Sequence, residues 1–240
     1  VVDFPDSFRD NRVLVDPIEF TNNAKIVKSY KKLNMTAENV KEYIEDGRLP
    51  AEWLEESDEM SVLVKILRAR QECESLKVKD IVTMAQDAVE EGYSVVVFMN
   101  FTESLMETAS LLDCQYIDGT VKQKDRNQIV EEFQSDKTNC IVVNAATGGT
   151  GISLHDIHGN RPRLSLISPS FNAKEFSQVL GRIHRNGAKS DALQKVMISN
   201  GSIEQYVMKA INRKMNNMNK IHHSQVGEFT SSYYTGDNQF

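Results

Sequence analysis

Two arginines near the end of the chain have a spacing that suits phosphate binding. Arg182 and Arg185 stand three residues apart in QVLGRIHRNG, where the pattern predicts a helix over residues 173–185. A guanidinium is permanently charged and presents a planar fork of N–H donors, so two of them can clamp phosphate oxygens. The alternative is a surface role in which both arginines pair with acids such as Glu175.

A glycine-rich loop, NAATGGTGISLHD over residues 144–156, is the second candidate for chemistry. Gly148, Gly149 and Gly151 remove side chains and permit positive φ, so backbone N–H groups can approach an anion. This pattern favours contact with phosphate or a nucleotide. A tight turn before a short helix explains the glycines equally well.

The chain lacks a Walker-type phosphate loop, which needs a lysine directly after a glycine and then Ser or Thr. The nearest match, NGAKS over residues 186–190, has Ala between the two. No apolar strand ends in paired acids that could hold Mg²⁺. The primary ATP site must therefore be supplied from elsewhere if the arginines act on a nucleotide.

The elements that must position these residues alternate between strand and helix after Gly92. Apolar, β-branched runs predict strands over residues 93–101, 115–119, 140–146, 163–169 and 192–199. Helical periodicity predicts helices over residues 102–113, 122–134, 173–185 and 202–220. Such alternation predicts an α/β fold with a doubly wound parallel sheet, in which ligands bind at the carboxyl ends of the strands.

The first part of the chain reads differently. Residues 1–20 are expected to be extended, and residues 21–91 mainly helical. Thr21, Thr36 and Thr102 are expected to cap the helices that follow them. Apolar residues recur at helical spacing over residues 62–69 and again over 78–92.

The composition is that of an ordinary globular protein with a net charge of −6. Its three cysteines are scattered along the chain, which is typical of reduced thiols. Residues 36–60 carry nine acidic and two basic side chains, whereas residues 161–220 carry eleven basic and three acidic ones. A basic C-terminal half suits a phosphate-rich partner, although solvated helix faces explain it too. We expect no membrane span and no signal peptide, hence a reducing intracellular location, cytoplasmic or nuclear. The absence of an initiator Met suggests a fragment.

Four segments, VVVFMNF, YIDGT with an arginine six residues on, NAATGGTGISLHD and QVLGRIHRNG, occur in this order. In order and spacing they resemble the second motor domain, the RecA-like helicase C-terminal domain, of superfamily-two helicases. The resemblance is nearest to the Swi/Snf-like and strawberry-notch-like branches. It implies that residues 1–20 are an extended linker from a missing first motor domain and that residues 21–67 are a helical acidic insertion or subdomain. Residues 68–220 would form the RecA-like domain, and residues 221–240 a tail.

In such motors ATP and Mg²⁺ sit between two similar domains, and the second domain brings arginines across the cleft. The resemblance thus implies that Arg182 and Arg185 are catalytic arginine fingers. It also implies ATP contacts from Gln178, Gly149, Gly151, Ser153 and Asp156. Many family members have Asp where Ser153 stands, which weakens that contact; Asp156 either compensates or caps a turn.

The same resemblance implies a nucleic-acid groove across the strand tips, reading backbone phosphates and not bases. Its expected residues are Gly119, Thr120, Lys122, Arg126, Asn144 and Thr147. The alternative is ordinary turn chemistry, with Arg126 bracing the loop internally. Phe98 and Phe101 are expected to be core residues.

The sequence therefore predicts the C-terminal motor domain of an ATP-dependent helicase or translocase, with DNA favoured over RNA as its partner. The isolated chain is expected to be inactive. The alternative is a non-catalytic nucleic-acid or partner-binding module on a degenerate motor fold. A stand-alone α/β enzyme is disfavoured because Asp118 and Asp156 each lack a second carboxylate nearby in the sequence.

Overall fold

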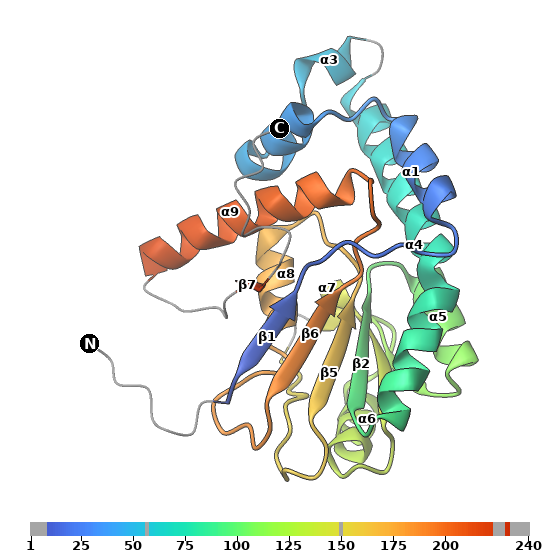
Figure 1. Ribbon diagram of the computed structural model, residues 1–240, viewed down its shortest axis with the longest axis vertical. Coiled ribbons are helices and arrows are strands. Elements are labelled where there is room, and N and C mark those ends of the chain that lie inside the picture. The colour runs from blue at the N-terminus through green and yellow to red at the C-terminus, as the bar shows by residue number, and fades with distance from the viewer. Residues whose placement is uncertain (1–8, 56–57, 149–150, 223–228, 231–240) are drawn as a thin grey trace.

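The computed structural model of the 240-residue chain describes residues 9–55, 58–148, 151–222 and 229–230 (Figure 1). A parallel sheet with the strand order β3-β4-β2-β5-β6-β1-β7 forms its centre. The strands span Asn11–Leu14 (β1), Ser94–Met99 (β2), Gln115–Ile117 (β3), Cys140–Asn144 (β4), Arg163–Ile167 (β5), Ala192–Val196 (β6) and Phe229–Thr230 (β7). The predicted α/β fold is confirmed.

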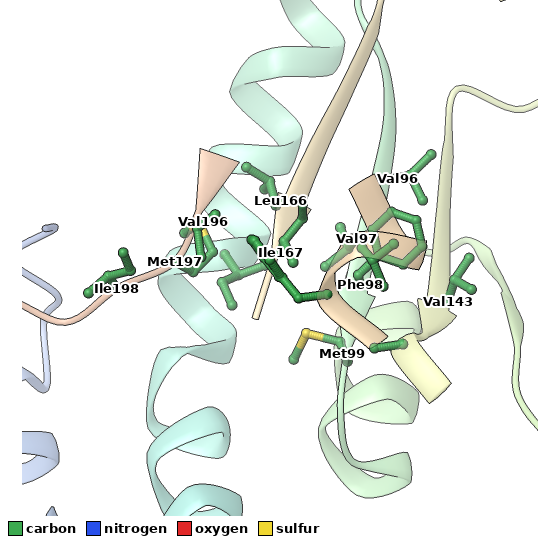
Figure 2. Close-up of a cluster of buried hydrophobic side chains, with 14 of the residues drawn as sticks. Val96, Val97, Phe98, Met99, Val143, Leu166, Ile167, Val196, Met197 and Ile198 are labelled. Carbon is green, nitrogen blue, oxygen red and sulfur yellow. The ribbon is translucent and has the colours of Figure 1, made fainter. Parts of the chain in front are cut away.

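Strand β2 lies in the middle of the sheet, and all of its residues are buried. It pairs with β4 on one side and β5 on the other, so that Val97 lies between Val142 and Leu166. Figure 2 shows Val97 and Phe98 in the cluster of apolar side chains that this arrangement creates. A strand buried on both faces needs a continuous apolar run, which explains why the sequence pattern identified it.

Helices cover the sheet, and the described ones differ widely in length, from 4 to 32 residues. They span Asn23–Lys31 (α1), Ala37–Lys41 (α2), Ala51–Leu54 (α3), Glu59–Glu90 (α4), Thr102–Leu111 (α5), Gln123–Gln134 (α6), Ala145–Gly148 (α7), Ala173–Leu180 (α8) and Glu204–His222 (α9), with a π-helical turn at Glu42–Asp46. In Figure 1, α8 lies behind β1 and β6, whereas α4 and α5 pack beside β2.

Helix α4 joins the N-terminal segment to the sheet. The helical runs predicted over residues 62–69 and 78–92 belong to this one helix of 32 residues. Its apolar stripe includes Cys73 and Ile81, which are fully buried in the same core as β2. Neither α4 nor any other helix in the described part of the chain is long and apolar enough to cross a membrane.

Strand β1 belongs to the sheet, although its residues fall within the segment expected to be an extended linker. It pairs with β6 and with β7, and Val13 is the register partner of Gln194. The expected boundary between residues 67 and 68 falls inside α4. The division of the chain into four parts stays a prediction.

Of the three predicted helix N-caps, one forms within its own helix and the other two do not. Thr36 forms the predicted cap, since it accepts from the backbone N–H of Asn39 and the Asn39 side chain accepts in return. The predictions for Thr21 and Thr102 are wrong. The hydroxyl of Thr21 donates to the Asp80 carboxylate at 2.6 Å instead of capping a helix. The cap position of α5 is Phe101, whose N–H donates to the Glu74 carboxylate of α4.

Candidate functional site

The arginine pair lies just beyond α8, in a turn. The helix ends at Leu180, and Gly181 closes it while the N–H of Arg182 donates to the Val179 carbonyl at 3.0 Å. The prediction of a helix through residue 185 is therefore wrong at its C-terminal end. The physical reason is that both arginines bond to another loop, which draws the chain away from the helix axis.

Gln178 lies exposed on α8, in the last turn of the helix. The predicted helix over residues 173–185 would place it on one face with Arg182, four residues on. That shared face is not formed, because Arg182 follows the end of the helix. Gln178 is nevertheless open to a ligand from outside the domain.

Arg185 makes three hydrogen bonds, two of them to the glycine-rich loop. Its Nη1 donates to the Ser153 hydroxyl at 2.6 Å, and its Nη2 donates to the Ile152 carbonyl at 3.3 Å. Its Nε donates to the Gly181 carbonyl at 2.9 Å, which folds the side chain back on its own turn. These acceptors are uncharged, so the positive charge of Arg185 is oriented without being neutralised by them.

Arg182 converges on the same loop from a more buried position. The residue is 5% exposed, and its Nη1 donates to the Ile152 carbonyl at 3.1 Å. Its own carbonyl accepts from the N–H of Leu154 at 2.9 Å. The Ile152 carbonyl is thus shared by both guanidiniums, which places Arg182 and Arg185 side by side.

Positive charge is concentrated around this shared carbonyl. Burial lowers the pKa of Arg182, and the neighbouring charge of Arg185 lowers it further. Burial, followed by Arg185 and Arg163, also lowers the pKa of His155. The guanidiniums stay protonated at neutral pH, so like charges are held together at this point. An anion arriving from outside would relieve that repulsion.

The glycine-rich loop reaches the arginines from the end of β4. Gly151 has φ +77°, a conformation that a side chain disfavours, and it directs the chain toward Ile152 and Ser153. Gly149, the other glycine expected near ATP, lies outside the described residues. Ser153 is half-buried against Arg185.

Asp156 is buried, and its carboxylate is engaged in a turn. Its Oδ1 accepts from the N–H groups of His158 at 3.0 Å and Gly159 at 2.9 Å. Burial acts to raise the pKa of Asp156, but these N–H donors and Ser190 outweigh it and the pKa is lowered. Of the two roles expected for Asp156, the geometry favours the turn cap.

The arginine pair and the expected nucleic-acid residues lie at different parts of the sheet. His184 bonds to the Arg9 carbonyl at 2.8 Å just before β1, and Gln194 in β6 donates to the Leu180 carbonyl at 3.0 Å. The arginine turn therefore lies toward the amino ends of β1 and β6. The expected nucleic-acid loops instead follow the carboxyl ends of β3 and β4. The arginine turn and these loops therefore lie toward opposite ends of the strands.

The loop after β3 is built around Asp118. This buried carboxylate accepts from the N–H of Thr120 at 2.9 Å and its hydroxyl at 2.7 Å, and from Val121 N–H at 3.3 Å. Burial acts to raise the pKa of Asp118, but these hydrogen bonds lower it overall. Gly119 and Thr120 are left exposed at the tip of the loop.

Two basic residues support this loop in different ways. Arg126 is buried in α6, and its Nη2 donates to the carbonyls of Asp118 at 3.2 Å and Val121 at 3.4 Å. It braces the loop from within, which is the alternative weighed for it. Lys122 is exposed at the start of α6 and can reach a ligand.

The loop after β4 is tied to the loop after β2. Asn144 is buried, and its side-chain amide donates to the Asn100 carbonyl at 3.2 Å. Asn100 in turn donates to the Pro169 carbonyl at 3.1 Å after β5. Thr147 lies in α7, but its side chain is outside the described positions.

The helicase conserved C-terminal domain is the family whose model matches this chain, over residues 76–187. The match begins in α4, includes β2 to β5 and α8, and ends just after both arginines. The chain carries a superfamily-two helicase C-terminal domain.

Curated relatives place this helicase C-terminal domain within longer proteins. The putative ATP-dependent RNA helicase L364 of Acanthamoeba polyphaga mimivirus is 30% identical over 222 residues, 91% of this chain and 39% of that protein. Helicase SWR1 of Kluyveromyces lactis is 25% identical over 165 residues, 66% of this chain and 10% of its own length. The chain thus spans well under half of these relatives.

Among solved structures, the C-terminal part of the Fun30 ATPase domain has the same fold. It superposes with a TM-score of 0.55 at 17% sequence identity, covering 85% of this chain and 90% of that one. At this identity the likeness concerns the fold alone.

Glu74, two residues before the matched helicase domain, is a buried polar residue that sequence reasoning missed. It is 2% exposed in α4, and its carboxylate accepts from the N–H groups of Asn100 and Phe101, both at 2.9 Å, and from the hydroxyl of Ser168. It therefore ties α4 to the loops after β2 and β5. The available signal was an acidic side chain on the apolar face of an amphipathic helix.

The second missed feature is a buried ion pair. Lys77 of α4 contacts Glu204 of α9 at 2.5 Å and donates to the Met197 carbonyl at 2.9 Å. The hydroxyl of Tyr30 donates to the same carboxylate at 3.1 Å. Burial and then the charge of Glu204 raise the pKa of Tyr30, so that it keeps its proton. This cluster joins α1, α4 and α9.

Proposed function

We propose that this chain is the second motor domain of an ATP-dependent nucleic-acid helicase or translocase. In this proposal Arg182 and Arg185 are arginine fingers that reach ATP held by a first motor domain. The observation that carries it is the convergence of both guanidiniums on the Ile152 carbonyl, within the matched helicase domain.

The geometry of Arg185 suits a finger. A guanidinium has five N–H donors, and three of those on Arg185 are used to fix its orientation against described residues. An N–H remains on each terminal nitrogen for phosphate oxygens. Because the side chain is already oriented, less conformational entropy is lost when it stabilises developing charge on a phosphoryl group.

The remaining nucleotide contacts are assigned by position. Gln178 is exposed on α8, and Gly151 and Ser153 belong to the loop that holds Arg185; Gly149 is assigned from the sequence motif alone. We assign the carboxylate of Asp156 to support of this loop, in place of the expected ATP contact, because it is engaged in the 156–159 turn. ATP bound with Mg²⁺ supplies the phosphoryl group to be transferred; we assign the Mg²⁺ ligands to the first motor domain.

Nucleic acid is assigned to the carboxyl edge of the sheet. Gly119, Thr120 and Lys122 are exposed there, next to the loop that contains Asn144 and Thr147. These groups suit backbone phosphates, which a motor can follow on any sequence. We favour DNA because the resemblance is nearest to the Swi/Snf-like branch; the mimivirus relative, however, is named an RNA helicase.

The test is the ATPase rate of the full-length parent protein, with and without single-stranded and duplex DNA and RNA. Arg182→Ala and Arg185→Ala are each expected to lower the stimulated rate by about 10³-fold or more while the protein stays folded. Arg48→Ala is the matched control, because this arginine is 73% exposed and pairs with Asp46 on the surface. The isolated 240-residue chain is expected to hydrolyse no ATP.

The alternative is a non-catalytic module that binds nucleic acid or a protein on a degenerate motor fold. It predicts that Arg182→Ala and Arg185→Ala behave like wild type in every ATPase assay. Lys122→Ala tests the nucleic-acid contact, which a motor shares with a nucleic-acid-binding module but not with a protein-binding one. In a motor it should weaken nucleic-acid binding uniformly across sequences and reduce the salt slope by about one.

A further inference from the structure

Cys114, the residue just before β3, lies beside Cys140, the first residue of the neighbouring parallel strand β4. Gln115 of β3 is the register partner of Ile141 of β4, so the two cysteines occupy the preceding pair of positions and point to the same face. Neighbouring strands lie about 4.8 Å apart. That spacing falls within the Cα separation of roughly 4.4–6.8 Å that a disulfide accepts. All three cysteines of the chain are free thiols here.

Both thiols are fixed by the fold. Asp113 has φ +47° and turns the chain out of α5, and the N–H of Cys114 donates to the Ala109 carbonyl at 3.1 Å. Beside Cys140, the Asn139 carbonyl accepts from Val95 N–H at 2.8 Å, which anchors the start of β4 to β2. The backbone that carries each of the two thiols is therefore fixed by hydrogen bonds.

A cavity gives solutes access to the pair. Cys114 and Cys140 are half-buried, and both line an open cavity of about 920 Å³ between α4, α5 and the start of β4. Lys137 also lines it and adds positive charge. This cavity lies at the amino ends of β3 and β4, opposite to the carboxyl ends that carry the proposed nucleic-acid loops.

The two thiols differ in their surroundings. The neighbouring Cys140 thiol lowers the pKa of Cys114, against the effects of burial and Asp113. The neighbouring Cys114, with burial, raises the pKa of Cys140. Cys73, by contrast, is fully buried, and burial raises its pKa to about 12. Since the thiolate is the nucleophile, Cys114 is the first to react.

We propose that Cys114 and Cys140 form a peroxide-sensitive dithiol that closes into a disulfide and covalently staples β3 to β4. The Cys114 thiolate attacks one oxygen of hydrogen peroxide, the O–O bond breaks, and a sulfenic acid and water result. The Cys140 sulfur then attacks the Cys114 sulfur. The S–O bond breaks, and hydroxide leaves with the Cys140 proton as water. Two thiols are oxidised by two electrons, and one peroxide is reduced to two waters.

The test treats the reduced full chain with hydrogen peroxide and maps its peptides by mass spectrometry without reduction. We expect a Cys114–Cys140 linked peptide that has lost two hydrogens and that dithiothreitol reverses. Cys140→Ser should stop at a sulfenic acid on Cys114 that dimedone captures. Cys73→Ser should behave like wild type, with Cys114 reacting about tenfold or more faster than Cys73 in the unchanged chain.

Two results would overturn this proposal. One is separate alkylation of Cys114 and Cys140 after peroxide treatment, with no linked peptide. The other is a disulfide that involves Cys73 or a second copy of the chain. Both can be read from the wild-type protein alone, so the test does not depend on folding of the variants.

Discussion

Arg185 and Ser153 stand 32 positions apart in the chain, and the guanidinium Nη1 donates to the serine hydroxyl over 2.6 Å. A second hydrogen bond runs from Nη2 to the Ile152 carbonyl, so the guanidinium contacts two neighbouring residues of the loop. The loop after β4 and the turn after α8 consequently form one unit. The direction in which Arg185 points depends on both segments.

Ser153→Ala is expected to lower the ATPase rate of the parent protein without unfolding it. The change removes one hydrogen bond worth about 1 kcal/mol. If that energy is used to orient Arg185, the rate falls by about fivefold. Ser153→Asp should retain the rate, because a carboxylate accepts from Arg185 in a charge-assisted bond. Ser135→Ala, on the exposed end of α6, serves as the control; equal rates for Ser153→Ala and wild type would contradict the positioning role.

Glu74→Ala is expected to destabilise the domain by about 3 kcal/mol, since it leaves the N–H groups of the half-buried Asn100 and Phe101 without their acceptor. Urea unfolding of the isolated chain measures the loss. Glu72→Ala is a close control, because Glu72 is exposed two residues away on the same helix. Its effect should stay within about 0.5 kcal/mol. A similar small effect for Glu74→Ala would show that water replaces the carboxylate.

The Lys77–Glu204 ion pair should be strongly coupled. Lys77→Met leaves a buried carboxylate unpaired and is expected to cost about 3–5 kcal/mol. The double variant with Glu204→Leu should cost less than the sum of the two single changes. A double-mutant cycle by chemical denaturation measures this coupling. Lys79→Met on the exposed side of α4 controls for the helix, and additive effects would disprove the coupling.

Stability should fall in acid through His155. Its pKa is lowered in the folded state by burial, Arg185 and Arg163, so the unfolded chain binds the proton more tightly. The contribution is therefore fully present above the unfolded pKa of about 6.5 and is lost as pH falls through the lower folded value. His155→Gln should flatten the stability profile in that window, whereas His158→Gln on the exposed turn should not.

Arg185→Ala gives an independent check on this electrostatic account. Removing the guanidinium should raise the pKa of His155 toward its ordinary value, as followed by NMR titration of the ring protons. An unchanged titration would mean that burial and Arg163 lower the His155 pKa without Arg185. The ATPase result for Arg185 does not affect this outcome.

The sequence by itself determined the layers of the fold. The apolar run of β2 and the helical periodicity of α4 are carried by consecutive residues, and so is the cap between Thr36 and Asn39. Such features follow from local backbone geometry, which a short stretch of chain specifies without knowledge of its neighbours. The motifs that mark the helicase domain are equally local.

Only the tertiary structure decided which polar groups meet. Glu74 accepts hydrogen bonds from Asn100 and Ser168, which lie 26 and 94 positions away. Thr21 donates to Asp80 and does not form its expected helix cap. The end of α8 is set by contacts of Arg182 with a loop 30 positions earlier. A polar side chain takes whichever partner packing brings within about 3 Å. That choice depends on how distant segments pack, which the order of residues does not display.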